Sequence, residues 1–287
     1  MSKKVVCENY LNEKITFEYK FPFFLESVDG LHEVLGVVSG MKSAYAIGES
    51  YVGTSVEKRN IIIKGAMRDD IINCRQKLYH MFPLKTVGTF YYYEDDLERK
   101  IEYRVESVKI PMNAKGKFKH FQISLICQNP YFTDIKKKTL QMATWIPKFR
   151  FPLKIPKEGI KFGERNKTSM VSIKNESNIE FGMTIMFKAN GMVVNPSLFN
   201  VDSREELKIE KTMQAGDTIT VTTHRQNKNI TYFSQENGLN ENINNLMVYG
   251  SKFLQIHHGL NTFRHNADEN MGNLETIIEY YAEYEAI

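Results

Sequence analysis

The sequence lacks the short motifs that mark the common enzyme classes. Its 287 residues contain no Gly-x-Ser-x-Gly, no His-Glu-x-x-His, no Walker phosphate loop and no Gly-x-Gly-x-x-Gly. The acidic run Glu94–Asp96 lacks the alternating oxygen ligands of a calcium loop, which favours a solvated hairpin tip. His257 and His258 would point to opposite faces of a strand, so they could not bind a metal together with His265. We therefore expect no enzyme activity, no catalytic residue, no cofactor and no metal site.

Cysteine and long apolar runs are also scarce. Cys7, Cys74 and Cys127 lie far apart without a Cys-x-x-Cys pair, which argues against a disulfide framework and a structural zinc site. Cys74 and Cys127 fall on predicted core faces, where cysteine acts as a small buried hydrophobic residue. No apolar run approaches the roughly 20 residues of a membrane helix. Residues 1–8 lack the apolar core of a signal peptide. We expect a soluble protein, made in a cytoplasm and without a membrane partner.

Excess charge of one sign is missing as well. The net charge is only +4, from 38 basic and 34 acidic residues, so the sequence is not typical of a nucleic-acid-binding domain. The excess of basic over acidic residues is local to the range between Lys136 and Arg165, where a solvated linker explains it better than an acidic partner does. The run Lys148–Phe151 alternates basic and aromatic residues, as some single-stranded nucleic-acid sites do. It has no supporting aromatic platform, so we do not expect such a site.

Residues 59–132 show the clearest periodicity. An apolar run at Ile61–Ile63 precedes a helix expected over Asp70–Phe82, which Pro83 ends. Three strands then complete a β-α-β-β-β unit, at Thr89–Tyr93, Ile101–Ile110 and Phe121–Cys127. Together with strands near residues 15–25, this predicts an α+β domain over residues 1–132. Its helix should cover one face of the sheet through Ile71, Cys74, Leu78 and Phe82.

A segment inside this domain breaks the pattern. Leu35–Val38 indicates a short buried strand, and the sequence from Ser39 to Asn60 then becomes irregular, with repeated glycine, serine and tyrosine. A long irregular stretch inside a compact domain is usually functional. We expect an extended arm near residues 39–58; a flexible loop is the alternative.

The second half of the chain differs in composition. Residues 133–167 carry prolines at a density that opposes helices and central strands, which predicts a connector. Residues 168–287 alternate apolar and polar residues in short runs, with a hairpin turn signal at Asn190–Gly191, and predict a β-sandwich. Asp217 is explained by turn chemistry after Gly216. A helix is the alternative for Glu275–Ala286. The expected strands cover 171–175, 183–187, 206–210, 218–223, 229–232, 253–257, 261–265 and 274–284.

Several runs of residues resemble a known family in order and spacing. In the first half they are Phe82–Lys85, the tyrosine-rich hairpin at 89–93 and Cys127–Phe132. In the second half they are Ser172–Asn175, Asn195–Leu198, Met213–Val221 and Gly259–Phe263. Together they resemble the distal tail proteins of long-tailed bacteriophages. Two positions depart from the family pattern: Glu176–Asn178 replaces a glycine turn, and Gly182 replaces a proline.

The resemblance implies a mainly β protein with a structural role at the tip of a phage tail. The N-terminal domain would form a ring, expected to be a hexamer, that joins the tail tube to the tip protein. The segment before Arg59 would reach toward a neighbouring subunit. DNA would only pass through the channel of the ring. The C-terminal domain would be galectin-like and would dock receptor-binding or adaptor proteins in the virion.

The sequence leaves two other functions open. A galectin-like sandwich could bind host carbohydrate, usually by stacking an aromatic ring on the sugar. The only tryptophan, Trp145, lies in the connector, so Tyr232, Tyr249 or Phe263 would have to supply the ring. The chain could also be the equivalent subunit of a contractile tail or of a phage-tail-like bacteriocin.

Overall fold

The chain folds into two compact units in the computed structural model, which describes residues 3–43, 45, 47–111, 118–142, 145–147, 163–165 and 169–287. Unit 1 comprises Met1–Ile135 together with Glu283–Ile287, and unit 2 comprises Lys136–Ala282. Both units are built mainly from antiparallel strands, so the predicted mainly β class is confirmed. No helix in the described ranges is long and apolar enough to cross a membrane.

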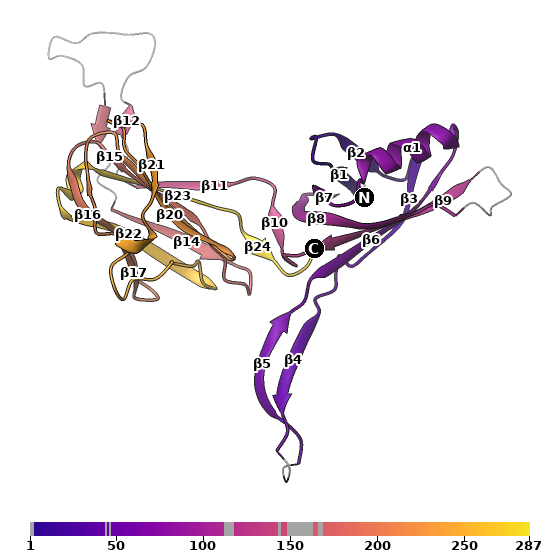
Figure 1. Cartoon of the computed structure of the whole chain (residues 1–287), viewed down its shortest axis with the longest axis horizontal. Coiled ribbons are helices and arrows are strands. Elements are labelled where there is room, and N and C mark those ends of the chain that lie inside the picture. Colours follow the sequence, from indigo (N-terminus) through magenta and orange to yellow (C-terminus); the bar gives the residue numbers. More distant parts are fainter. Residues whose placement is uncertain are drawn as a thin grey trace, which may run out of the picture. The chain divides into compact units, whose positions relative to one another are not determined.

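Unit 1 is organised around a nine-stranded sheet with the order β2-β1-β7-β8-β9-β6-β3, with β10 pairing with β8 and β24 (Figure 1). The β7–β8 hairpin turns at Asp95, whose backbone is left-handed with φ 50°. The three strands predicted after the helix are confirmed as β7, β8 and β9. The strands are β1 (Lys3–Glu8), β2 (Lys14–Phe17), β3 (Phe23–Asp29), β6 (Arg59–Met67), β7 (Val87–Glu94), β8 (Leu97–Lys109), β9 (Lys119–Cys127), β10 (Phe132–Asp134) and β24 (Glu283–Tyr284).

The predicted helix is confirmed as α1 (Ile71–Met81). The Asp70 carboxylate accepts a hydrogen bond from the backbone N–H of Asn73 at 3.5 Å, which caps the first turn. At the other end the N–H of Phe82 donates to the carbonyl of Leu78 at 3.0 Å, and Pro83 follows. The predicted apolar face packs on the sheet: Cys74, Leu78 and Phe82 are buried, and Ile71 is partly buried against them.

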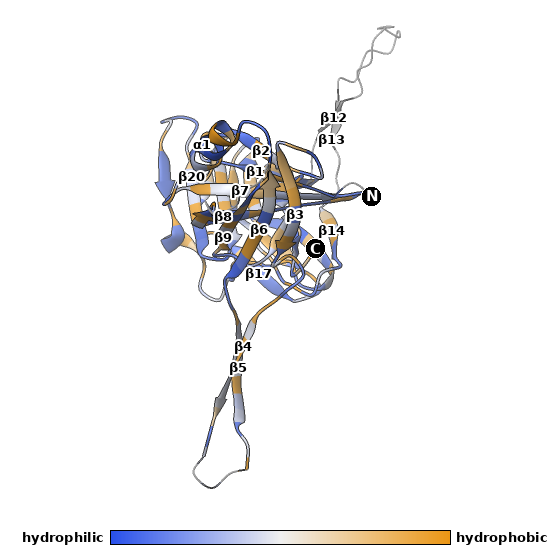
Figure 2. Cartoon of the chain, turned by 90° about the vertical axis from the view of Figure 1, so that its right-hand side faces the viewer, coloured by the Kyte–Doolittle hydropathy of each residue, from blue (hydrophilic) through white to orange (hydrophobic). Residues whose placement is uncertain are grey.

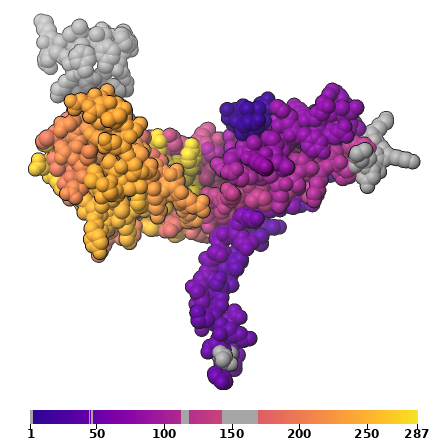
Figure 3. Space-filling view, in the orientation of Figure 1, coloured from indigo at the N-terminus to yellow at the C-terminus, as the bar shows by residue number. Residues whose placement is uncertain are grey.

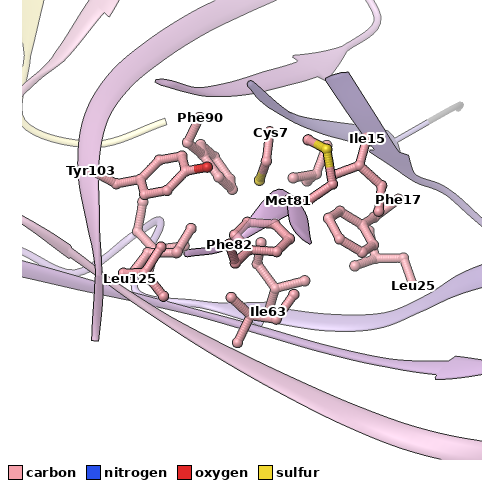
Figure 4. Packing of buried hydrophobic residues seen from close by; sticks show 14 of the residues in the cluster. Cys7, Ile15, Phe17, Leu25, Ile63, Met81, Phe82, Phe90, Tyr103 and Leu125 are labelled. Carbon is pink, nitrogen blue, oxygen red and sulfur yellow. The ribbon is translucent and has the colours of Figure 1, made fainter. Parts of the chain in front are cut away.

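The core of unit 1 lies between this helix and the sheet. Met81 and Phe82 lie among side chains from several strands, including Cys7, Phe17 and Ile63 (Figure 4). The Phe82 ring stacks on Phe17 with 6.2 Å between centroids. Cys7, Cys74 and Cys127 are free and buried, and thus pack as small hydrophobic residues.

The segment between β3 and β6 differs from the prediction. It forms an antiparallel hairpin of β4 (Gly36–Met41) and β5 (Ser50–Val56), with a bulge between Ser39 and Gly40 (Figure 1). The expectation of a buried strand at Leu35–Val38 was wrong, since Val38 is 69% exposed. Apolar β-branched residues indicate a strand, but they do not say whether another layer covers it.

Unit 2 contains two larger sheets, with orders β11-β23-β15-β19-β20-β21 and β14-β22-β16-β17, the second with β18 paired to β16. Alternate residues are buried, such as Ile185 and Phe187 on β15 and Ile219 and Val221 on β19, which is the pattern of a β-sandwich. The strands are β11 (Lys138–Met142), β14 (Met170–Asn175), β15 (Thr184–Ala189), β16 (Val193–Asn200), β17 (Glu205–Lys208), β18 (Thr212–Met213), β19 (Thr218–His224), β20 (Asn227–Phe233), β21 (Asn240–Asn242), β22 (Gly259–Glu269) and β23 (Leu274–Tyr280). Two short 3-10 helices, η1 (Asn244–Leu246) and η2 (Met271–Asn273), lie in its connections.

Three details of unit 2 differ from the sequence expectations. Strand β16 was not among the expected strands. It contains Pro196, a residue that is rare in central strands, yet Asn195 has φ 51° and the pairing with β22 resumes at Pro196. Residues 253–257 form only an isolated bridge, between Phe181 and Ile256. The expected last strand is present as β23, but the chain then leaves the sandwich and β24 joins the sheet of unit 1.

The predicted connector is described only in part. Residues 143–144, 148–162 and 166–167 of this region lie outside the described residues. The described part contains β11, which belongs to unit 2, and a short pair of β12 (Trp145–Pro147) with β13 (Gly163–Arg165).

Candidate functional site

The hairpin β4–β5, which we call the arm, is the most exposed apolar element of unit 1. Neither of its strands contains a charged residue, and almost every position on both faces is exposed. Val38 and Tyr51 are each 69% exposed, and Met41 and Val52 are similar. The arm projects from the rest of unit 1, with apolar residues along its strands (Figures 2 and 3). An isolated two-stranded hairpin is at best marginally stable in water, and its uncharged edges invite pairing. The arm therefore leaves an apolar surface that its own unit does not cover.

Arg59 anchors the root of the arm, by which we mean the place where the arm joins the sheet. It is the first residue of β6, after the short connection that follows β5. The side chain is 5% exposed. Its Nε donates to the carbonyl of Pro130 at 2.7 Å, and its Nη1 donates to the carbonyl of Gly30 at 2.6 Å. The guanidinium also lies 4.8 Å from the centre of the Phe132 ring. Burial lowers the pKa of Arg59, although an arginine stays charged at neutral pH. One buried cation thus joins both strands that lead into the arm.

The end of the chain is held at the same root. The Nη2 of Arg59 donates to the carbonyl of Glu285. Ile287 donates from its N–H to the carbonyl of Leu31 at 3.4 Å, and an Ile287 oxygen lies 3.0 Å from Nδ1 of His32. Residues 283–287 therefore brace the segment that leads from β3 into the arm.

Gly30 makes this root possible. It has φ +85°, and a Cβ there would collide with the carbonyl of Asn60. The sequence indicated a turn at Asp29–Gly30, and the structure adds that only glycine allows β3 and β6 to approach at this point.

The polar face of the sheet in unit 1 carries a groove of about 350 Å³. Its lining mixes Lys100 and Arg104 with Glu102, so it has no strong preference for one sign of charge. Tyr91, also in the lining, donates from Oη to Glu8 at 3.0 Å. Burial and the neighbouring Glu8 carboxylate raise the pKa of Tyr91 to about 12, so it remains a hydrogen-bond donor at neutral pH. This arrangement suits polar contacts.

The histidines considered from the sequence do not meet at one point in unit 2. His257 lies between Glu180 and Glu205, at 3.1 and 3.2 Å. The Nδ1 of His258 is 2.9 Å from the carbonyl of Ser177, and the buried His265 pairs with Thr276. Across the described ranges, no group of three or more histidine, cysteine or acidic residues could hold a metal.

Two of the three rings considered as sugar platforms are buried. Phe263 lies in the sandwich core, and Tyr232 is buried with its Oη donating to Asp217 at 2.7 Å. Tyr249 is fully exposed, and the side chain of Trp145 lies outside the described residues. Burial would raise the pKa of Asp217, but hydrogen bonds from Tyr232 and from two backbone N–H groups lower it below its ordinary value. These contacts give Asp217 the turn role that its place after Gly216 indicated.

Comparisons with known proteins give matches at the level of structure. No protein-family model and no curated protein sequence matches the chain. The Dit protein of phage SPP1, described as a hub adsorption apparatus of phages infecting Gram-positive bacteria, superposes with a TM-score of 0.69 at 12% identity. The match covers 98% of this chain and 99% of that one. The chain has the fold of a phage Dit hub protein.

The baseplate of phage P2 provides two further matches to the Dit-like fold. Its activated conformation with calcium superposes with a TM-score of 0.53 at 10% identity, covering 100% of both chains. The form with strontium gives 0.54 at 12% identity, covering 99% of each. The resemblance inferred from the sequence is thus confirmed for the fold. Sequence reasoning missed the contacts of Arg59, although an arginine just before the apolar run Ile61–Ile63 was a visible signal.

Proposed function

We propose that this protein is a structural component of a bacteriophage tail tip or baseplate. The observation that carries the proposal is the Dit-like fold over both units, matched along nearly the full length of both chains. The side chains with shifted pKa values support a structural role, because those described above cap turns or pair strands. The protein would act in the tail of the virion, after synthesis in the cytoplasm of the bacterial host.

The N-terminal domain, residues 1–132, forms a ring in this proposal, expected to be a hexamer. It joins the tail tube to the tip protein and leaves a channel through which DNA passes. The exposed arm, whose two strands carry no charge, supports this assignment, because its apolar surface is not covered within its own unit. A ring requires a heterologous contact, in which one surface meets a different surface of the next copy.

The C-terminal domain, residues 168–287, serves as the docking site for receptor-binding or adaptor proteins. Its sandwich has few exposed rings, and the burial of Tyr232 and Phe263 disfavours the alternative of a carbohydrate-binding module. The two matches to the P2 baseplate also support a role within a larger assembly.

The test is the oligomeric state of the purified full chain. We expect light scattering to give a mass that is a multiple of the monomer, and electron microscopy to show rings with a central opening. A protein that stays monomeric at high concentration and forms no rings with a tail-tube or tip partner would contradict the proposal.

A further inference from the structure

Strand β8 lacks a partner along part of the side that faces β9 and β10. Arg104 pairs with Ile126 of β9. Lys100 pairs with Thr133 of β10. Between these two pairs, no residue in the described part of the chain pairs with Ile101–Tyr103 on this side. On its other side, β8 pairs with β7 without interruption. The sheet of unit 1 thus contains a short gap beside β8.

The backbone of Glu102 faces this gap. The β7–β8 hairpin has a two-residue turn, so Glu94 and Leu97 form its first hydrogen-bonded pair, and every second residue of β8 after Leu97 bonds to β7. Glu102 falls between these positions, so its N–H and C=O point to the other side. The carbonyl of Lys100 accepts a hydrogen bond from Oγ1 of Thr133 on β10 at 3.4 Å, which agrees with this alternation. Glu102 therefore presents one donor and one acceptor that no strand of the described residues pairs.

Contacts on the far side of the gap keep it open. After β9 the chain leaves β8 through Gln128–Tyr131 and returns to it at β10. In this segment the carbonyl of Pro130 accepts a hydrogen bond from Nε of the buried Arg59 at 2.7 Å, and the Tyr131 side chain is buried. Both contacts hold the segment away from Glu102, so the gap is a fixed feature of the fold.

The groove of about 350 Å³ on the polar face of the sheet lies at this gap. Its walls include Glu102, Gln128 from the segment between β9 and β10, and Tyr91 from β7. Its volume falls in the range of about 300–1,000 Å³ that is typical of ligand sites. The charges of Lys100, Glu102 and Arg104 alternate in sign along β8, so they select neither an anion nor a cation. The groove suits a neutral group that offers an acceptor beside a donor.

We propose that the gap beside Glu102 binds a carboxamide group, carried by an asparagine or glutamine side chain of a partner protein in the tail. The inference rests on the proposed function, which requires contacts with other tail proteins. A carboxamide holds a carbonyl beside an N–H, so it accepts from the N–H of Glu102 and donates to its C=O. A continuous strand does not fit, because the pairs Arg104–Ile126 and Lys100–Thr133 close the gap at both ends. A side chain enters from the exposed face of the sheet.

Hydrogen exchange of individual amides in the full chain, followed by NMR, tests the gap itself. We expect the amide of Glu102 to exchange at least about tenfold faster than the amide of Arg104, which is paired with Ile126. Equal protection of the two amides would overturn the inference, because Glu102 would then already have a partner within the chain.

Acetamide and acetate test the ligand class, because they are similar in size and only acetamide offers an N–H donor. Acetamide added to the isotope-labelled full chain should shift the amide resonance of Glu102, and acetate should shift it at least about fivefold less. Gln128→Trp, at an exposed residue of the groove wall, should abolish the shift. Glu98→Trp, at an exposed residue on the same face of β8 outside the groove, should preserve it. Equal shifts with both compounds, or none with acetamide, would overturn the inference.

Assembled tail particles test the partner. The amide of Glu102 should exchange at least about tenfold more slowly in particles than in the isolated chain, because the partner's carboxamide covers it. Gln128→Trp should enter particles at least about tenfold less efficiently than Glu98→Trp. Particles in which Glu102 exchanges as fast as in the isolated chain would overturn the inference and leave the proposed function standing. A chain that enters no particle would overturn the proposed function and the partner with it, whereas the carboxamide site would stand or fall with the acetamide titration.

Discussion

Helix α1 and the arm are two elements of unit 1 outside its nine-stranded sheet, and they relate to that sheet in opposite ways. The helix buries Cys74, Leu78 and Phe82 against strands of its own sheet. The arm keeps Val38 and Tyr51 in solvent. A helix that lies on a sheet buries one apolar face against it. A two-stranded hairpin that extends away from the sheet has no neighbouring layer, so both of its faces stay exposed. The helix therefore serves folding, and we assign the arm to assembly.

The largest effect on stability should follow from Leu78→Asp in the helix. The substitution buries an unpaired carboxylate where a fully buried leucine packed, at a cost of about 4 kcal/mol or more. Unit 1 should lose its cooperative thermal transition by circular dichroism. Ile72→Asp is the control on the same helix, since Ile72 is 62% exposed and its replacement should change the free energy of unfolding by less than about 0.5 kcal/mol. If both substitutions lowered the free energy of unfolding equally, the conclusion that only one face of the helix is buried would be wrong.

The next largest effect should come from Arg59→Met at the root of the arm. The methionine would keep some packing against Phe132 but leave the carbonyls of Gly30, Pro130 and Glu285 without their donor. We expect a loss of about 2–4 kcal/mol in urea unfolding, because several buried acceptors lose their partner. Limited proteolysis near residues 283–287 should become faster. Arg104→Met, at an exposed arginine of the same sheet, should leave both measurements unchanged.

A smaller effect should accompany acidification at the end of the helix. Glu13 accepts hydrogen bonds from Asn9 and from His80 on α1, and these lower its pKa below the ordinary 4.5. A carboxyl with a lowered folded-state pKa stabilises the protein above its unfolded pKa, and that contribution is lost as the pH falls through the folded pKa. Glu13→Gln should therefore flatten the fall of the melting temperature below pH 4.5. Asp96→Asn, at the exposed tip of the β7–β8 hairpin, should give the same dependence of the melting temperature on pH as the unsubstituted protein. If Asp96→Asn flattened this dependence as well, the role of Glu13 would be contradicted.

The smallest effect on stability, and the largest on assembly, should come from the arm. Val38→Asp combined with Val52→Asp adds charge where both side chains are already exposed. The melting temperature should shift by less than about 2 °C, since exposed substitutions rarely exceed about 0.5 kcal/mol. Oligomers should disappear in light scattering. Leu84→Asp, at another exposed apolar residue of unit 1, should leave the oligomers intact. Intact oligomers in the arm variant would show that the arm does not have the role we propose.

The sequence by itself determined the elements whose residues repeat with a clear period. The helix over 70–82 was predicted because apolar residues three and four positions apart form one face of a helix. The strands after it were predicted because apolar residues at every second position form one face of a sheet. The Dit-like fold followed from runs of residues in both halves and is confirmed by the structural matches.

Only the tertiary structure decided which apolar strands are buried and where the chain ends. Leu35–Val38 has the composition of a core strand, yet it lies in the exposed arm because no layer of the fold reaches it. Arg59 precedes the apolar run Ile61–Ile63 in sequence, but its role depends on carbonyls from Gly30, Pro130 and Glu285, which are remote from it in sequence. The last residues have the pattern of a sandwich strand throughout, but after β23 they pair with β10 of unit 1. The local sequence pattern indicates which side chains are apolar and which segments form strands. Which element buries those side chains, or pairs with those strands, depends on contacts between distant parts of the chain.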